Sequence, residues 1–387
     1  MSIKKLIGKI HLWLGFASGL VVFVIAITGC ILAFEHEIKK MAFTYLTTET
    51  REDVKPLPPS KLKAIAGPLV TGKKPNAISY PGRDKSATVM YYGANPDYYY
   101  QVFIDPYTGE VKKVWSEEED FFHFILHGHF YLWLPPAIGQ PVVATATLVF
   151  VIMLISGLVL WWPKNKSAAK QRFSVKWKAQ WRRLNYDLHN VLGFYMMAIG
   201  FVLAFTGLVW GFEWFSKSLY FVTTGGKSLT DAEVLVSDTT QIGKVTNPED
   251  IIWQKLYAKA SKDEGVYFYM PADDKGTLEA GINHRPGTYY NSDTYVYDQH
   301  TLKQFPANAL YNGEYADKGF GDKLRRMNYD IHVGAIFGLP GKIIMFLASL
   351  ICASMPVTGI YIWWGRKYKS KKKQPVKKMP ALAKSSI

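Results

Sequence analysis

Long apolar stretches alternate with long polar segments along this chain. Mostly apolar runs fall at 12–34, 137–162, 191–215 and 343–364. Each is long enough to cross the ~30 Å hydrocarbon core of a bilayer as a helix. Polar segments at about 36–120 and 216–322 follow the first and third runs, and a short loop at 163–183 joins the middle two. The pattern predicts a membrane protein with four helical spans.

Basic residues gather in three short segments at the ends of these spans. The 387 residues hold 46 Lys+Arg against 31 Asp+Glu, a formal net charge of +15. Segments 1–10, 163–183 and 365–387 carry 20 of the basic residues and no acidic residue. Because short basic loops stay in the cytoplasm, both termini are expected inside and both long segments outside. The excess charge therefore indicates topology, and we expect membrane lipid, not nucleic acid, as its partner.

Each long polar segment contains three strand-like runs rich in β-branched and aromatic residues. They fall at 77–80, 87–92 and 98–104 in the first segment, and at 266–270, 277–282 and 294–297 in the second. Two cysteines in the whole chain exclude a disulfide framework. We expect each segment to form a small external α+β domain.

The spans repeat along the chain. Features of the first span recur 178 residues later in the third: His11 with His189, Gly15 with Gly193, and Thr28-Gly29 with Thr206-Gly207. Features of the second recur in the fourth: Gly157 with Gly359 and Trp161-Trp162 with Trp363-Trp364 at an offset of 202, and His127 with His332 at an offset of 205. The sequences Arg182–His189 and Arg325–His332 are identical at six of eight positions.

These repeats predict a mostly α integral membrane protein whose four transmembrane helices come from a duplicated two-helix unit, with two external α+β domains. The expected order is span one at 1–35, an external domain at 36–122, a surface helix and turn at 123–136, span two at 137–163, a basic loop at 164–184, span three at 185–215, a second external domain at 216–324, span four with its approach at 325–365, and a basic tail at 366–387.

Four histidines precede the spans at repeat-related positions. The expected topology puts His11 and His189 at the inner ends of spans one and three, and His127 and His332 at the outer ends near spans two and four. Two imidazoles that face each other across a helical bundle can ligate one haem iron. The pattern favours two bis-histidine haems, one in each leaflet. A transition-metal site, a proton relay and interface chemistry remain alternatives.

Arginine and tyrosine recur before two of these histidines. Arg182 and Tyr186 precede His189 by seven and three residues, and Arg325 and Tyr329 precede His332 in the same way. Such spacings put the side chains on the ligand face of a helix, where they can bind a haem propionate. No residue is predicted to act as a nucleophile or general base.

Residues 116–133 predict an amphipathic helix on the outer membrane surface. Ser116 and Glu119 have the spacing of a capping box. The helix carries His123, His127 and His129, and the repeat favours His127 as the partner of His332. His123 and His129 are alternative ligands at this end, and His123 and His127 also have the spacing to hold a metal together.

The spans resemble the PepSY-associated transmembrane family of bacterial inner membranes. The resemblance is carried by His11, Gly15 and Thr28-Gly29, by Gly157 and Trp161-Trp162-Pro163, by His189, Gly193 and Thr206-Gly207, and by His332, Gly359 and Trp363-Trp364. The sequence Asp105-Pro106-Tyr107-Thr108-Gly109-Glu110 resembles the strand and turn of a PepSY domain, and the second segment departs from it with Gln299-His300.

Members of this family include inner-membrane ferric-siderophore reductases with two b-type haems on transmembrane histidines. The resemblance implies an oxidoreductase of the inner membrane, with two bis-histidine haems b at His11, His189, His127 and His332. It also implies a ferric-siderophore or other Fe(III) chelate as periplasmic substrate. The chain shows no dinucleotide-binding fingerprint, so we expect a separate electron donor, either a cytoplasmic flavin reductase or a quinol.

Two other functions fit the same resemblance. PepSY domains are also associated with the regulation of peptidases, so a non-enzymatic membrane scaffold is one alternative. A metal or haem transporter that uses the repeat interface is the other. Bound haem distinguishes them, because the reductase requires it and the scaffold does not.

Overall fold

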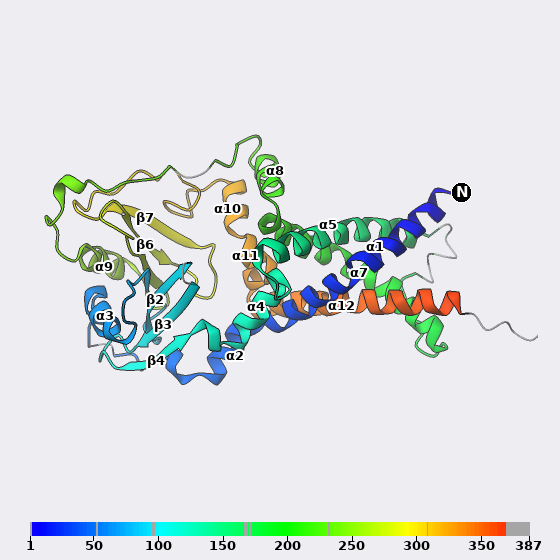
Figure 1. Ribbon diagram of the computed structural model, residues 1–387, viewed down its shortest axis with the longest axis horizontal. Helices are drawn as coiled ribbons and strands as arrows, with labels where there is room; N and C mark the ends of the chain where they lie inside the picture. Colours follow the sequence, from blue (N-terminus) through cyan, green and yellow to red (C-terminus); the bar gives the residue numbers. More distant parts are fainter. Residues whose placement is uncertain are drawn as a thin grey trace, which may run out of the picture.

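The computed structural model has a helix bundle at one end and a sheet domain at the other (Figure 1). It describes residues 2–51, 53–94, 97–163, 165, 169, 172–230, 233–307 and 309–368. Most of the predicted basic tail and part of the predicted basic loop lie outside the described residues. We call the end of the bundle beside the sheet the sheet end, and the end that carries the N-terminus the far end (Figure 1).

Four long helices form the bundle: α1 (Ile3–Leu32), α5 (Pro136–Trp161), α7 (Trp181–Gly211) and α12 (Gly338–Lys367). All four are long and apolar enough to cross a membrane, as the sequence predicts. Small residues allow close packing between them. A Cβ built at Gly19 of α1 would lie only 3.3 Å from the Pro356 ring of α12. The helices extend beyond the apolar runs, most clearly in α7, which begins ten residues earlier.

Five shorter helices connect the bundle to the sheet (Figure 1). They are α2 (Glu35–Ala42), α4 (Phe121–Tyr131), α8 (Glu213–Thr223), α10 (Phe320–Arg326) and α11 (Asn328–His332). The 3-10 turn η5 (Ala335–Phe337) leads from α11 into α12. The approach to the fourth span is therefore a series of short helices.

The predicted surface helix begins later than expected. The Asp120 side chain caps α4 by accepting a hydrogen bond from the Phe122 N–H at 3.0 Å. Ser116 is the last residue of strand β4 and pairs with Tyr100, and the 3-10 turn η3 (Glu117–Glu119) follows it. The predicted capping box at Ser116 and Glu119 is therefore wrong. Helix α4 packs against α1 and α5 of the bundle.

The strands of both polar segments join one sheet. Strands β1 (Ala77–Tyr80), β2 (Ala87–Ala94), β3 (Asp97–Ile104) and β4 (Val111–Ser116) come from the first segment, and β5 (Gly265–Tyr269), β6 (Thr277–Asn283) and β7 (Ser292–Asp298) from the second. The order is β4-β3-β2-β1-β5-β6-β7. Antiparallel pairing of β1 with β5 sets Ile78 opposite Phe268. The two expected domains are thus continuous, and neither β1 nor β5 is left as an open edge.

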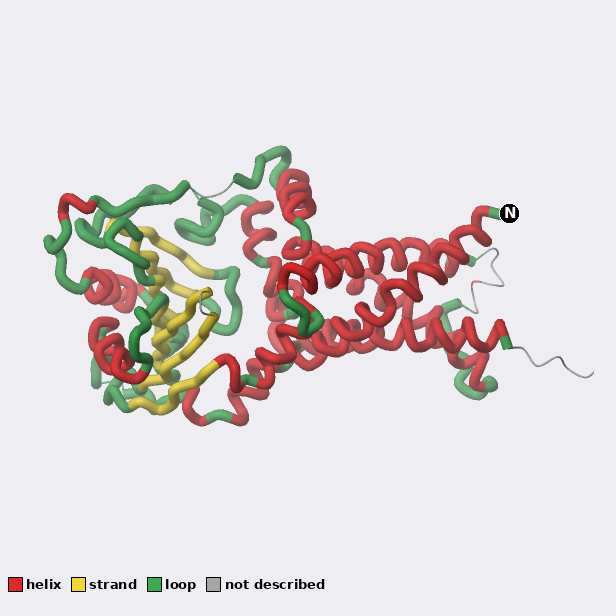
Figure 2. The backbone as a smooth tube through the Cα atoms, in the orientation of Figure 1, coloured by secondary structure: helices red, strands yellow, loops and turns green. Residues whose placement is uncertain are grey.

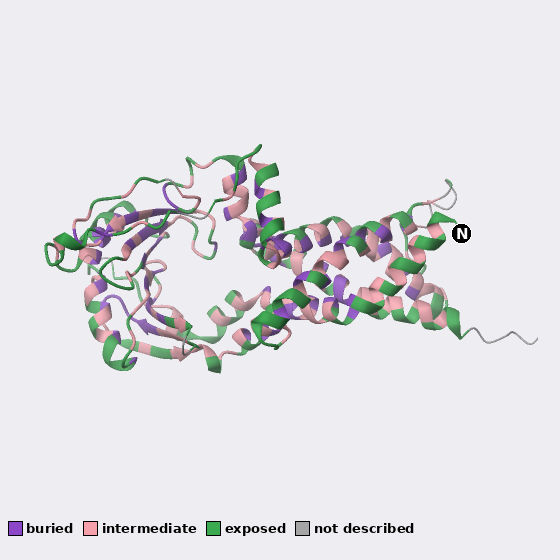
Figure 3. Cartoon of the chain, turned by 45° about the horizontal axis from the view of Figure 1, so that its top comes forward, coloured by how far each residue is buried: buried purple, intermediate pink, exposed green. Residues whose placement is uncertain are grey.

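Helices α3 (Pro59–Ala66) and α9 (Pro248–Lys259) cover the face of the sheet that is turned away from the bundle (Figure 2). Leu62 and Ile252 from these helices pack with Ile78 and Phe268 of the central strands. All four side chains are at most 2% exposed. Buried positions recur along the strands of the sheet (Figure 3).

The two segments use the same turn after their third strand. Asp105 accepts hydrogen bonds from the N–H groups of Tyr107 and Thr108, at 2.8 and 3.2 Å. Asp298 accepts equivalent bonds from His300 and Thr301, at 2.8 and 3.0 Å. Residues 109 and 302 both have positive φ, 79° at the glycine and 61° at the leucine. The substitution of Gln299-His300 for Pro-Tyr therefore leaves the turn unchanged, because its geometry depends on the aspartate.

His284 forms a partly buried ion-pair cluster just after the end of β6. Its Nδ1 lies 2.6 Å from Glu264 Oε1, and its Nε2 lies 2.9 Å from Asp293 Oδ2. Burial alone would lower the pKa of His284, but the hydrogen bonds to both carboxylates outweigh burial and raise this pKa. A raised pKa in the folded state stabilises the fold below the unfolded value of about 6.5, and this stability is lost as pH rises through the folded-state pKa.

The His284→Gln variant is expected to be less stable than the wild type by about 1 kcal/mol near pH 5, because glutamine cannot carry the charge that both carboxylates bind. The difference is expected to narrow near pH 9, where the wild-type imidazole is neutral. Thermal unfolding of both proteins at the two pH values measures it. A difference that widens as pH rises would contradict this assignment.

Candidate functional site

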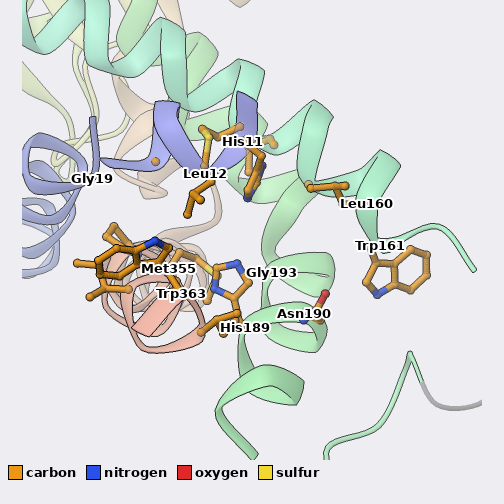
Figure 4. Close-up of a pocket in the computed structure, with 18 of the residues that line it drawn as sticks. His11, Leu12, Gly19, Leu160, Trp161, His189, Asn190, Gly193, Met355 and Trp363 are labelled. Atoms are coloured by element: carbon orange, nitrogen blue, oxygen red, sulfur yellow. The ribbon is translucent and has the colours of Figure 1, made fainter. Parts of the chain in front are cut away.

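His11 and His189 line one cavity at the far end of the bundle. The cavity has a volume of about 460 Å³, within the range of cofactor pockets. Both imidazoles point into it, His11 from α1 and His189 from α7 (Figure 4). The structure therefore brings together the two histidines that the sequence pairs at this end.

Apolar side chains and glycines form most of the cavity wall. Gly8 and Gly15 of α1, Gly157 of α5, Gly193 of α7 and Gly359 of α12 all line it. Glycines on all four long helices leave room for a flat ligand close to the backbone. Tyr186 and Arg366 supply polar groups at the wall. The cavity suits a large, mainly apolar cofactor with a polar edge.

A second pair of histidines lies at the sheet end. The ring centroids of His129, on α4, and His332, on α11, are 6.2 Å apart. The indole of Trp210 lies edge-on to His332, with the centroids 5.4 Å apart. Each end of the bundle therefore holds one histidine pair, and the helices α1 and α7 connect the two ends.

The expected pairing of His127 with His332 is not found. Successive helical residues turn by about 100°, so His127 and His129 project from nearly opposite faces of α4. His127 packs against Tyr131, with ring centroids 5.1 Å apart. His123 Nδ1 is 2.6 Å from Glu117 Oε1, which accounts for its orientation without a metal. Of the three candidates, His129 is the one that reaches His332.

All four paired histidines make the same contact with a neighbouring helix. Nδ1 of each ring is hydrogen-bonded to a serine or threonine hydroxyl: His11 with Ser156 at 2.8 Å, His189 with Thr358 at 2.8 Å, His129 with Thr28 at 3.0 Å, and His332 with Thr206 at 2.7 Å. A glycine follows each of these hydroxyl residues. The site therefore contains four copies of one unit, a histidine held by a Ser/Thr-Gly dipeptide.

Sequence reasoning missed this unit. Thr28-Gly29 and Thr206-Gly207 stand out as a repeat, but Ser156-Gly157 and Thr358-Gly359 complete the set in spans two and four. The offsets also favour His129. It precedes His332 by 203 residues, close to the 202 between Gly157 and Gly359, whereas His127 requires 205. A search for a Ser/Thr-Gly dipeptide in every span would have found the unit, and a comparison of the offsets would have favoured His129.

The repeated motif before His189 and His332 fixes the helices around each pair. Asn185 Nδ2 donates to the Thr358 carbonyl, and Asn328 Nδ2 donates to the Thr206 carbonyl, each at 3.1 Å. The motif aspartates are buried as well. Asp187 accepts a bond from Arg183 Nε at 3.0 Å, and Asp330 accepts the N–H groups of two residues of the β6–β7 loop.

The four residues predicted to bind haem propionates lie in different surroundings in the structure. Tyr186 lines the far cavity, but Arg182 is exposed at the start of α7, and Arg366 lines the wall instead. Tyr329 packs on Tyr289, with centroids 5.0 Å apart, and Trp210 is the aromatic residue beside His332. The helix breaks at Met327, between Arg325 and His332, so the helical spacing that linked Arg325 to the ligand face does not apply.

Each histidine pair presents two imidazoles to a metal. Among the described residues, no hydrogen bond engages Nε2 of His11, His189, His129 or His332, so each ring keeps one nitrogen free. A metal–imidazole bond is about 2 Å long, so two such bonds fit within the 6.2 Å between the centroids at the sheet end. In the described part of the chain, no cluster of three or more His, Cys, Asp or Glu could hold a metal ion. A bis-imidazole haem suits this donor set.

The Nε atom of Arg325 is buried and has no hydrogen-bond partner within the described residues. A buried guanidinium nitrogen without a partner is costly, and an anionic group such as a propionate would satisfy it.

A family model described as PepSY-associated TM region matches residues 9–366, nearly the whole chain. No curated protein matches the chain.

Proposed function

This chain belongs to the PepSY-associated TM family, so it is a multi-pass membrane protein, and from this premise we propose that it is a di-haem inner-membrane reductase. In this proposal two bis-histidine haems b would supply one-electron exchange across the membrane, and the substrate would be a periplasmic ferric-siderophore, reduced from Fe(III) to Fe(II). The observation that carries the proposal is the presence of one histidine pair at each end of a four-helix bundle, with no hydrogen bond at Nε2 of any of the four rings among the described residues.

The two pairs have the roles of an inner and an outer haem site. His11 and His189 would hold the inner haem, and His129 and His332 the outer one. Haem supplies one-electron exchange through its iron, without a covalent bond to the substrate. The chain's own residues hold the imidazoles, exclude water with apolar side chains and glycines, and keep the two sites at opposite ends of the bundle. No nucleophile or general base is required.

The charge distribution supports the direction of electron flow. The far end carries the described residues of the basic segments 1–10 and 163–183, and neither segment has an acidic residue in the sequence. The positive-inside rule assigns that end to the cytoplasm and the sheet domain to the periplasm. A separate donor, either a cytoplasmic flavin reductase or a quinol, would supply electrons to the inner site.

The matching halves of the molecule support its origin from a duplicated unit with PepSY-like external parts. Strands β1–β3 and β5–β7 are each preceded by a helix and take corresponding places on either side of the β1–β5 pair. Their turns at Asp105 and Asp298 have the same hydrogen bonds. The histidine units repeat in the same way across the bundle.

Iron chemistry explains why reduction would release the metal. Siderophores bind the hard Fe(III) ion through oxygen atoms, and the softer Fe(II) ion is a poorer match for those ligands. One electron leaves the donor and one enters each Fe(III). Release then follows from the weaker binding of Fe(II), with no hydrolysis of the chelator.

Proteoliposomes test the proposal. The haem-loaded protein is reconstituted with its far end inside, with an impermeant reductant enclosed and a ferric hydroxamate chelate outside. A coloured Fe(II)-specific chelator is expected to show Fe(II) outside, at a rate proportional to protein. A haem-loaded protein that reduces no external chelate would contradict the reductase. A folded protein without haem would favour the scaffold or transporter alternative.

A further inference from the structure

Each paired histidine is bound by a hydroxyl that has already used its only proton. We propose that Ser156, Thr358, Thr28 and Thr206 are positioning residues that fix His11, His189, His129 and His332 as the tautomer with a proton on Nδ1, so that Nε2 is the metal ligand. This inference rests on the proposed function in one respect, the identification of the metal as haem iron.

The protons of the four hydroxyls are engaged within their own helices. Each hydroxyl donates to a carbonyl in the preceding turn: Thr28 to Val24 at 2.8 Å, Thr206 to Val202 at 2.6 Å, Thr358 to Ser354 at 2.8 Å, and Ser156 to Met153 at 3.2 Å. A hydroxyl has one proton and two lone pairs. Since that proton is engaged by the helix, the hydroxyl can only accept from the imidazole.

A neutral imidazole has one ring nitrogen that carries a proton and one that carries an in-plane lone pair. If Nδ1 donates to the hydroxyl, the lone pair lies on Nε2. No hydrogen bond engages Nε2 of these four rings within the described part of the chain. All four rings therefore present an unprotonated Nε2, whose lone pair can bind a metal.

The glycine after each hydroxyl residue lies beside the same imidazole. A Cβ built there would lie close to Cε1 of the same ring: 3.3 Å at Gly29 for His129, 3.6 Å at Gly157 for His11, 3.8 Å at Gly207 for His332, and 3.6 Å at Gly359 for His189. The ring edge between its two nitrogens thus lies against bare backbone. The hydroxyl sets the direction of the ring, and the glycine allows its close approach.

Two of the four units have an additional anchor. Asn185 and Asn328 lie four residues before His189 and His332, on the same face, and bind the carbonyls of Thr358 and Thr206. The histidine and the asparagine therefore bind the hydroxyl and the carbonyl of a single threonine. This double contact fixes the register between the helix of the ligand and the helix of the hydroxyl.

The hydrogen bond also affects the metal. An N–H that donates to an acceptor makes the other ring nitrogen a stronger base, and the loss of such outer partners typically costs about 10–100-fold in metal affinity. A more basic ligand favours the more positive iron, so the hydroxyl lowers the reduction potential of the site. Removing it is expected to shift the midpoint potential upward.

The Thr206→Val variant tests this at the sheet end, because valine has nearly the same shape and lacks the hydroxyl. Thr206→Ser restores the hydroxyl. Thr147→Val is the matched control, since the Thr147 hydroxyl donates to Val143 at 2.8 Å on α5 and binds no histidine. In the haem-loaded proteins, the midpoint potential of the haem at His129 and His332 is expected to rise in Thr206→Val only. Thr206→Ser and Thr147→Val are expected to keep the wild-type potential.

The tautomer is measured independently of haem. NMR of the full-length apoprotein with ¹⁵N-labelled histidine is expected to show a proton on Nδ1 of His332 in the wild type and a mixture of tautomers in Thr206→Val. A wild-type His332 protonated on Nε2 would overturn the inference, as would an unchanged tautomer and potential in Thr206→Val. If Thr206→Val fails to fold, the wild-type spectrum alone decides. A protein that never binds haem contradicts the proposed function but leaves this measurement valid.

Discussion

Replacing His129 with alanine is expected to reduce the haem content of the purified protein from two per chain to one, and replacing His127 is expected to leave it at two. The reason is the geometry of α4, where the His129 ring lies 6.2 Å from His332 while His127 packs against Tyr131. A single imidazole cannot retain a six-coordinate low-spin haem at the sheet end. Pyridine haemochrome assay of each variant, normalised to protein, measures the content.

His332→Ala is expected to give the same loss as His129→Ala, and the double variant is expected to lose no more than either alone. That equality distinguishes a shared site from two independent ones. His127→Ala is the matched control, because it removes an imidazole from the same helix. Loss of one haem in His127→Ala together with full retention in His129→Ala would restore the pairing expected from the repeat.

His189→Ala is expected to remove the other haem and to abolish electron transfer across the membrane. His189 and His11 line the same cavity, and the far end has no further histidine pair among the described residues. The remaining haem, at His129 and His332, would keep its low-spin spectrum and would still be reduced by reductant added on its own side. Spectra of the variant in detergent and electron transfer in sealed liposomes check both halves of this prediction.

The comparison with His332→Ala sharpens that test. Both variants would contain one haem per chain, so both are expected to fail in transmembrane transfer by the same degree. They would differ in which side of the membrane reduces the remaining haem. A His189→Ala protein that still carries electrons across sealed liposomes would contradict the assignment of two haem sites in series.

The sequence was a good guide to the spans and strands, because their burial imposes a regular pattern. Four apolar runs became α1, α5, α7 and α12, and all six predicted strands exist within a few residues. The union of the strands into one sheet was not predictable. It depends on pairing between β1 and β5, in which Ile78 lies opposite Phe268, 190 positions later in the chain. Periodicity carries no information about such partners.

One of the two histidine pairs was also predictable from the sequence. His11 and His189 recur at a fixed offset on two long helices, so the repeat locates them directly. His129 belongs to the short helix α4, whose rotation is set by packing on α1 and by the bond from its Nδ1 to Thr28. A two-residue choice on one helix turns the side chain by about 200°, so the small difference between the offsets 203 and 205 decides which residue faces inward.

The presence of two haems on the four histidines is tested most directly by the haem content of the protein itself. The chain is purified in detergent from haem-replete cells, and its visible spectrum is recorded before and after dithionite, with a pyridine haemochrome assay for stoichiometry. Two low-spin b haems per chain are predicted, with none left when His11, His129, His189 and His332 are all replaced by alanine. A folded wild-type protein with no Soret band would contradict the proposal.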